Sequence, residues 1–402
     1  MDRRKFLIHS FGLVGGIFLE SCSDPKAPKI KLPKTSVVKN ASITSGKSLE
    51  DGVVQAAFRF LDEGNPPMDT LSGVGLGGRR FTDLFNLPMD GSPVGNDQFF
   101  VRTGVPISYQ NRFPWKIRIG DTLRSPYFID VSEIQSLERP QGVCVLECAG
   151  NDPGGRFGLL SAAEWDGASI QDILETIEKR SKIPNSTSRI LISGVDDHAP
   201  DGVSVPGASW IFTPEQLVSS GAFLATRMNS EPLSPENGHP VRLIIPGWYG
   251  CACIKWIDRI FWVKENATAT AHMQDYAERT HQTGIPALAK EFRPAVMAMA
   301  ALPVRIEKWK VADGILYRVV GLLWGGDNAD EDLQIRTGEE KWDDVEFAVK
   351  RRSTSGWSVW TYLWLPERPG DFTIRLRPKN STIKSIRLES GYYSRTCRID
   401  QV

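Results

Sequence analysis

The sequence predicts an α+β protein, in which a mixed domain of strands and helices is followed by an all-β sandwich. Three observations support this prediction. The chain has 402 residues, which is more than one hydrophobic core usually spans, so two domains are expected. From about residue 96, strand-like runs mix with a few helices but lack the regular alternation of a doubly wound sheet. Beyond residue 296, short strand-like runs follow one another with turn signals between them.

Residues 1–22 have the features of an export signal rather than of a folded element. Arg3 and Arg4 precede an apolar run that is too short to span a bilayer as a helix. The pair resembles a twin-arginine signal, which exports folded proteins, and a general secretory signal is the alternative. The motif LESC at 19–22 resembles a lipobox that would lipidate Cys22, although Glu20 is unusual there. We therefore expect a periplasmic or otherwise exported protein, with a lipid anchor at Cys22 as an open alternative.

Residues 23–95 are expected to form a tether and an N-terminal extension. The stretch 23–50 is rich in Pro, Lys and Ser, which is typical of a solvated linker. Residues 48–64 combine a Ser N-cap with helical apolar spacing, which predicts a helix that ends at Gly64. The sequence GVGLGG at 73–78 matches a dinucleotide-binding pattern, but no strand precedes it and no strand–helix–strand unit follows. We expect a flexible loop there.

Residues 96–290 are expected to form the mixed domain. Its clearest helix covers residues 168–182, where apolar side chains recur at helical spacing, at Ile170, Ile173, Leu174 and Ile177. Runs that are β-branched or alternating and bounded by Gly, Pro or Asp predict strands at 97–106, 115–120, 142–150, 188–196 and 239–247. A loop-rich stretch over 272–294 then leads out of this domain.

Residues 296–402 are expected to form the sandwich. Seven short strand candidates with turn signals between them cover 303–311, 315–325, 332–338, 343–351, 358–366, 371–379 and 383–390. Such a series of short strands is typical of a β-sandwich rather than of a mixed sheet.

Composition excludes some classes of partner and site. The 48 basic and 48 acidic residues give a formal net charge of zero, so no nucleic-acid partner is expected. The five histidines form no close cluster, which argues against a multi-histidine zinc or copper site.

The cysteines leave several interpretations open. In an extended strand, Cys144 and Cys148 would lie about 13 Å apart, whereas a disulfide tolerates roughly 7 Å between Cα atoms. Cys251 and Cys253 would lie about 6.6 Å apart with parallel side chains. Cys148 ends a strand-like run at a turn formed by Gly150 and Asn151, so its sulfur would face a loop-built cavity. Taken alone, Cys148 could be a buried side chain that only packs the core, half of a more distant disulfide, a nucleophile or a ligand for a soft metal.

A series of motifs in this order resembles the sulfite oxidase family of molybdopterin enzymes. The motif LECAGN at 146–151 resembles the family segment whose cysteine binds molybdenum. The resemblance covers roughly residues 96–375 and assigns roles by position. It implies Cys148 as the metal ligand, Arg102 facing substrate and cofactor, Trp165 and Tyr276 in the substrate pocket, and Arg242 and Lys255 on the pterin phosphate.

The resemblance also implies a cofactor and partners. The expected cofactor is molybdopterin with molybdenum, and the expected reaction is oxygen-atom transfer on a small sulfur compound. No fused haem domain is evident, so electrons would pass to or from an external carrier such as a cytochrome. The tail, with LLWGGD and WSVWTYLW, resembles the family's immunoglobulin-like dimerisation domain, so a homodimer is expected.

Several positions depart from the family pattern. Asp152 and Pro153 follow the CAGN turn where sulfite oxidases place an anion-binding arginine, and Arg156 is the nearest candidate to replace it. Asp327 and Asp330 stand where another arginine is expected. The two pterin-contacting histidines are replaced by Gly104 and Asn237, with His239 close to the second position. These departures leave two alternatives, an S-oxide or N-oxide reductase acting on a neutral substrate and a non-catalytic cell-surface binding lipoprotein.

Overall fold

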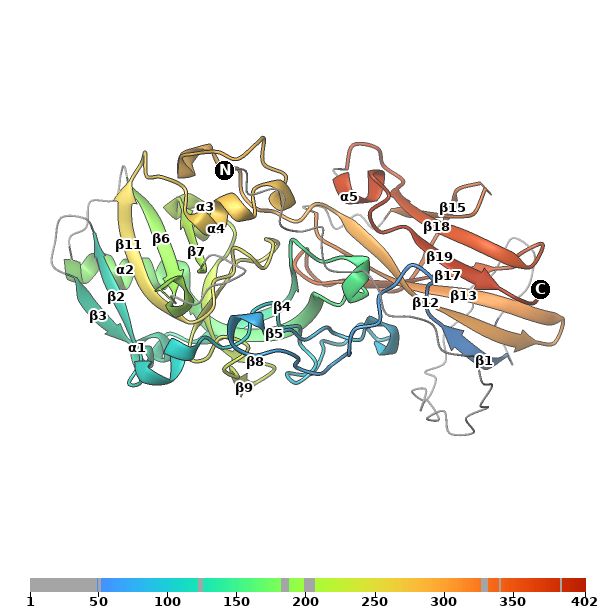
Figure 1. Cartoon of the computed structure of the whole chain (residues 1–402), viewed down its shortest axis with the longest axis horizontal. Coiled ribbons are helices and arrows are strands. Elements are labelled where there is room, and N and C mark those ends of the chain that lie inside the picture. Colours follow the sequence, from blue (N-terminus) through green and yellow to red (C-terminus); the bar gives the residue numbers. More distant parts are fainter. Residues whose placement is uncertain are drawn as a thin grey trace, which may run out of the picture. The chain divides into compact units, whose positions relative to one another are not determined.

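Two antiparallel or mixed sheets build the region that contains the LECAGN motif (Figure 1). The first has the order β10-β8-β5-β4, with β9 added at β8. Its strands are β4 (Arg139–Glu147), β5 (Leu160–Ser169), β8 (Phe223–Met228), β9 (Glu231–Pro232) and β10 (Arg242–Ile244). The second has the order β3-β2-β11-β6-β7, in which only the β11–β2 pair is parallel. Its strands are β2 (Lys116–Asp121), β3 (Tyr127–Asp130), β6 (Ser188–Gly194), β7 (Ser209–Phe212) and β11 (Ile257–Lys264).

This computed structural model describes residues 49, 52–121, 126–181, 188–198, 207–326, 332–339, 341–383 and 385–402. All of them belong to one compact unit, Val38–Val402. The predicted export signal with Arg3, Arg4 and Cys22 lies outside the described residues, as do Asp327 and Asp330. Among the described residues, no helix is long and apolar enough to cross a membrane.

Few helices accompany the sheets. The α-helices are α1 (Val131–Ser136), α2 (Ile170–Ser181), α3 (Pro214–Ser219), α4 (Ala271–Asp275) and α5 (Ile386–Glu389). Short 3-10 turns are η2 (Gly75–Gly77), η3 (Leu84–Asn86), η4 (Ile107–Arg112), η5 (Pro153–Gly155), η6 (Val195–His198), η7 (Glu278–Thr280) and η8 (Ala289–Glu291). Helix α2 begins where Ser169 Oγ accepts a hydrogen bond from Asp172 N at 3.1 Å, which is N-cap geometry. The strand-rich α+β prediction is confirmed at this level.

Two further sheets consist of strands from the C-terminal part of the chain, drawn in orange and red in Figure 1, together with the N-terminal strand β1, drawn in blue. One has the order β1-β12-β13-β17-β16 and consists of β1 (Val53–Phe58), β12 (Ala300–Val311), β13 (Gly314–Trp324), β16 (Glu346–Val349) and β17 (Ser358–Trp364). The other has the order β15-β14-β18-β19 and consists of β14 (Leu333–Thr337), β15 (Asp343–Asp344), β18 (Gly370–Pro378) and β19 (Arg395–Ile399).

Three predicted elements are wrong. The helix expected over 48–64 is instead strand β1, which pairs antiparallel with β12 from Val53↔Lys310 to Phe58↔Ile306. The ladder to β12 decides its conformation, because tertiary pairing outweighs helical spacing in so short a segment. The strand expected over 383–390 contains helix α5, where Ser385 Oγ donates to Glu389 Oε1 at 2.8 Å. The strand expected over 97–106 is reduced to an isolated bridge between Val101 and Arg80.

Candidate active site

Strand β4 carries the chain into the interior and ends directly before Cys148. Its burial increases along the strand until the last four residues are all buried. Cys148 N then donates to Leu159 O at 2.9 Å, and Asn151 N donates back to Cys148 O at 2.9 Å. The fully buried Asn151 side chain accepts from Leu159 N at 3.0 Å. The 148–151 turn is therefore held by hydrogen bonds at both ends, and the sulfur of Cys148 has a fixed position.

Cys148 lines a cavity together with four of the other predicted site residues. Arg102, Arg242, Lys255 and Tyr276 all contribute to its wall. Burial raises the pKa of the Cys148 thiol, while the Gly150 N–H at 3.4 Å and the charges of Arg102 and Arg279 act in the opposite direction. A buried thiol that faces cationic side chains is suited to lose its proton when a metal cation binds.

Arg242 is a buried cation, and Lys255 is a partly buried one nearby. Arg242 donates to Asn237 O at 3.1 Å and to Cys253 O at 3.3 Å, but its Nε is buried without a hydrogen-bond partner among the described residues. Burial lowers the pKa of Arg242 to about 10. Burial and the neighbouring charge of Arg242 hold the pKa of Lys255 well below its ordinary value of 10.5. Such a pair favours an anion, so these residues fit the phosphate of a pterin cofactor.

The cavity has a volume of about 80 Å³ while these two side chains bond to main-chain carbonyls. Lys255 Nζ donates to Glu236 O at 2.9 Å and also to Thr103 O. A pterin phosphate would therefore have to replace carbonyl oxygens as the partner of Lys255.

A glycine-rich turn forms another part of the wall. Residues 73–78 contain the 3-10 turn η2, and Leu76 of this turn lines the cavity that Cys148 also lines. A Cβ added at Gly104 would lie 2.4 Å from Gly75 O and 3.0 Å from the Cα of Gly78. No side chain fits at Gly104, which explains why the histidine expected there is missing. The expectation of a flexible loop at 73–78 overlooked this packing beside the cavity.

Two predicted site residues do not line the cavity. Trp165 is fully buried behind it, with the guanidinium carbon of Arg242 5.5 Å from its ring centroid. Its ring therefore makes a cation–π contact with Arg242 and does not line this cavity. His239 is half-buried and stacks on Phe113 with 5.9 Å between ring centroids. Tyr276 does line the cavity, and burial raises the pKa of its phenol.

The residue before Cys148 is a buried carboxylate that binds the C-terminal part of the chain. Glu147 is 0% exposed and accepts from Arg387 Nη1 at 3.2 Å, Tyr393 Oη at 2.6 Å and Trp324 Nε1 at 2.9 Å. Arg387 Nη2 also donates to Ala149 O at 2.6 Å. Side chains from β13, α5 and the segment before β19 therefore fix both sides of Cys148. No sequence pattern predicts these contacts, because the residues that form them lie up to 246 positions apart.

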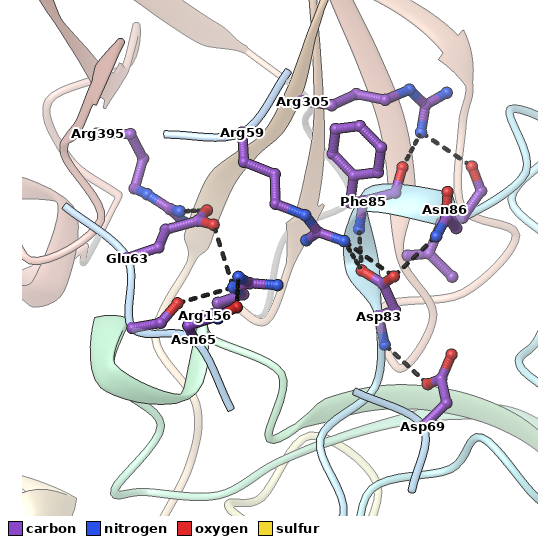
Figure 2. A network of polar contacts seen from close by, with 12 residues as sticks. Arg59, Glu63, Asn65, Asp69, Asp83, Phe85, Asn86, Arg156, Arg305 and Arg395 are labelled. Atoms are coloured by element: carbon purple, nitrogen blue, oxygen red, sulfur yellow. Dashed lines mark hydrogen bonds and ion pairs between the residues drawn. The ribbon is translucent and has the colours of Figure 1, made fainter. Parts of the chain in front are cut away.

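Arg156 does not replace the missing anion-binding arginine. Figure 2 shows its guanidinium turned toward Glu63 and Asn65 of the N-terminal extension. Its Nε donates to Gly64 O at 2.8 Å and lies 3.7 Å from Glu63 Oε2. Glu63 also pairs with Arg395 of β19 (Figure 2). Arg156 is thus part of a structural network, and Asp152 caps η5 by accepting from Gly155 N at 2.9 Å.

Arg279 is the functional candidate that the sequence analysis missed. A Cβ added at Gly150 would lie 3.6 Å from Arg279 Nη1 and 4.0 Å from Cys148 Sγ, so these two groups flank Gly150 closely. Arg279 also lies over the Tyr276 ring at 4.8 Å. Its only signal in the sequence was its place three residues after Tyr276 in the DYAERT motif.

Comparison with known proteins identifies the region that contains this cavity. A family model described as the oxidoreductase molybdopterin binding domain matches residues 103–271. The mitochondrial sulfite oxidase of Drosophila melanogaster is 24% identical over 292 residues, 66% of this chain and 49% of that protein. That of Mus musculus is 22% identical over 294 residues, 67% of this chain and 53% of that protein. This chain thus spans about half the length of these two relatives.

A solved structure supports the same fold over more of the chain. The sulfane dehydrogenase SoxCD from Paracoccus pantotrophus aligns with a TM-score of 0.58, covering 78% of each chain at 15% sequence identity. At that identity the match establishes the similarity of fold.

Proposed function

We propose that residues 103–271, which match the oxidoreductase molybdopterin binding domain, form a molybdopterin-binding domain of the sulfite oxidase type, and that the protein transfers an oxygen atom to or from a sulfur compound at a molybdenum centre bound by Cys148. The predicted family, the molybdenum oxidoreductase class and the molybdopterin cofactor are confirmed for this domain. The finer assignments of ligand, substrate and partners are part of the proposal.

One observation carries the proposal. Cys148 shares a buried cavity with Arg242 and Lys255, so a soft metal ligand and a phosphate-binding cation pair meet in one place. When bound, the cofactor supplies oxygen-atom transfer and storage of two electrons. The residues of this chain supply position and orientation. The hydrogen bonds of the 148–151 turn hold the Cys148 sulfur in place, and the side chains of Arg102 and Tyr276 donate hydrogen bonds that orient a substrate.

The test is a pair of assays on protein purified through its own export signal. Sulfite oxidation is followed by ferricyanide reduction, and dimethyl sulfoxide reduction is followed by oxidation of reduced viologen. We expect turnover in one of the assays, lost in Cys148→Ser and retained in Cys397→Ser, a buried cysteine of β19. Turnover that survives in Cys148→Ser would contradict the ligand assignment.

The reductase alternative has a specific observation in its favour. Arg156 is engaged by Glu63 and Asn65, while Asp152 lines a larger cavity beside Cys148. This distribution of charge suits a neutral or larger substrate better than it suits the sulfite dianion. Activity in the viologen assay alone would select this alternative.

The partners and the location are also proposals. A one-electron carrier such as a cytochrome would exchange electrons with the centre, and an exported location follows from the twin-arginine-like signal with Arg3 and Arg4. We assign the C-terminal sheets to an immunoglobulin-like dimerisation domain by their two-sheet, strand-rich composition. Light scattering of the purified protein tests the dimer, and mass measurement of the mature chain tests lipidation at Cys22.

A further inference from the structure

A second, larger cavity lies against the same turn. It has a volume of about 540 Å³, which is in the range of pockets for organic ligands and far above the space that sulfite needs. Its wall includes Ala149 and Gly150, directly after Cys148, and Arg102 lines both cavities. We call this second cavity the vestibule. The vestibule thus lies next to the Cys148 turn and shares Arg102 with the first cavity.

The inner end of the vestibule is cationic. Arg102 has a buried Nη1 without a hydrogen-bond partner among the described residues, and it stands where the two cavities meet. Arg279 reaches the other side of Gly150, and its carboxylate partner, Asp275, is 3.6 Å away with both side chains partly exposed. Two guanidinium groups therefore face the space next to Cys148, with donors left for an anionic group.

The vestibule wall also carries two exposed carboxylates. Asp152 and Glu278 line the vestibule but not the Cys148 cavity, and both are exposed. Neither forms an ion pair with another residue in the described part of the chain. Burial lowers the pKa of His281, so this neighbour is neutral at pH 7. Arg387 also lines the vestibule, but Glu147 and the Ala149 carbonyl already bind its guanidinium.

Two partly exposed hydrophobic side chains belong to the same wall. Ile386 and Tyr392, 48% and 38% exposed, both belong to the wall of the vestibule. They supply a surface for the hydrocarbon body of a ligand that is longer than an inorganic anion.

We propose that the vestibule binds a zwitterionic organic sulfur compound, with its anionic sulfur–oxygen group at Arg102 and Arg279 and its cationic group at Asp152 and Glu278. This inference rests on the proposed function and names its substrate class. The separation of charges within one cavity selects against sulfite and other small dianions, because the two carboxylates repel a second negative charge.

Calorimetric titration of the purified wild-type protein tests the proposal with three probes: 2-aminoethanesulfonate, ethanesulfonate and inorganic sulfate. We expect 2-aminoethanesulfonate to bind about fivefold more tightly than ethanesulfonate, as partly exposed ion pairs allow. Sulfate is expected to bind most weakly. Equal affinity for the two sulfonates, or tightest binding of sulfate, would overturn the proposal.

Substitutions test the anion-binding arginine and the two carboxylates of the vestibule separately. Arg279→Gln is expected to weaken both sulfonates by about tenfold, as for loss of one charge-assisted contact. Asp152→Asn with Glu278→Gln is expected to remove the preference for the amine while leaving ethanesulfonate unchanged, and the asparagine side chain keeps an oxygen for the η5 cap. Arg398→Gln, which breaks an exposed ion pair with Asp371, is the matched control and should change no affinity. Unchanged sulfonate binding in Arg279→Gln would contradict the assignment.

Binding and cofactor content are measured on the same preparation. A protein with molybdenum and pterin but no preference for the aminosulfonate would refute this inference and leave the proposed function intact. A protein without metal or pterin would refute the proposed function, whereas the charge preference of the vestibule would still be measured by the titration.

Discussion

At the residue scale, Arg242 and Lys255 give the strongest indication that this site binds an anion. Arg242 is buried and Lys255 is partly buried, and removal from water lowers the pKa of both. Cations removed from water destabilise a folded protein unless an anion compensates them, so this pair points to a ligand that neutralises it.

We therefore predict opposite effects of Lys255→Met on folding and on cofactor binding. In cofactor-free protein, removal of the partly buried cation should raise the free energy of unfolding by about 1 kcal/mol. The same variant should retain less pterin after purification, because it lacks the phosphate donor. Chemical denaturation and pterin fluorescence measure the two effects. Lys264→Met, at the exposed end of β11, is the control and should change neither. Full pterin content in Lys255→Met would argue against a phosphate site.

Gly104 gives a second prediction at this scale. Because an added Cβ would meet Gly75 O at 2.4 Å, Gly104→Ala must displace the 73–78 turn. We expect a loss of stability of about 1–3 kcal/mol from this overpacking, together with faster proteolysis near residue 75. Gly142→Ala has open space around the added Cβ but a positive φ of 81°, so it separates backbone strain from steric clash. A Gly104→Ala protein with wild-type stability and proteolysis would contradict the packing described.

At the element scale, the end of β4 is held by residues from the C-terminal sheets. Glu147 accepts from Arg387, Tyr393 and Trp324 within the buried interior. The C-terminal region is thus a structural part of the active site as well as a candidate dimerisation surface.

Removing only the cationic partner of the Glu147 carboxylate should lower the free energy of unfolding. Arg387→Met would leave the Glu147 carboxylate buried without its cation, and we expect a loss of about 3 kcal/mol in the free energy of unfolding. Arg387→Met combined with Glu147→Gln should recover part of that loss, because no buried charge remains. Urea denaturation of the single and double variants measures both, with Arg398→Gln as a surface control. Strictly additive losses would show that the two side chains are not coupled.

Strands β12 and β13 carry a pH-dependent contact. Glu307 lies 2.8 Å from Arg305 and 2.6 Å from Arg318. Burial alone would raise the pKa of Glu307, but these guanidinium groups lower it below its ordinary 4.5. The ion pairs thus stabilise the fold above pH 4.5, and this contribution is lost as the pH falls through the lowered pKa. Glu307→Gln should lower stability at pH 7 and reduce its decline between about pH 5 and 3, as measured by urea denaturation. The same steep decline in the variant would exclude Glu307 as its source.

At the scale of the whole molecule, prediction succeeded where a signal was local. The run before Cys148 and the apolar spacing of 168–182 place β4 and α2 nearly where the structure has them. Segments whose conformation depends on distant partners were misjudged: β1 becomes a strand because β12 pairs with it.

The same distinction applies to the site. Cys148, Arg102, Tyr276, Arg242 and Lys255 lie within recognisable motifs, and the structure brings all five to one cavity. Arg279, Arg387 and Glu147 gain their importance from contacts between distant parts of the chain, which no spacing reveals. Trp165 was placed in the pocket, but its ring lies behind Arg242 instead.

The most direct test of the central claim is the molybdenum and pterin content of exported wild-type protein beside Cys148→Ser and Cys144→Ser. Cys144 is the matched control because it is a buried cysteine within β4, four residues before Cys148. We predict about one molybdenum and one pterin per wild-type chain, with Cys144→Ser like wild type. Cys148→Ser should keep pterin, through Arg242 and Lys255, but lose activity and the thiolate-to-metal absorption. A wild-type protein without metal and pterin, or a Cys148→Ser protein with unchanged absorption and activity, would contradict the account.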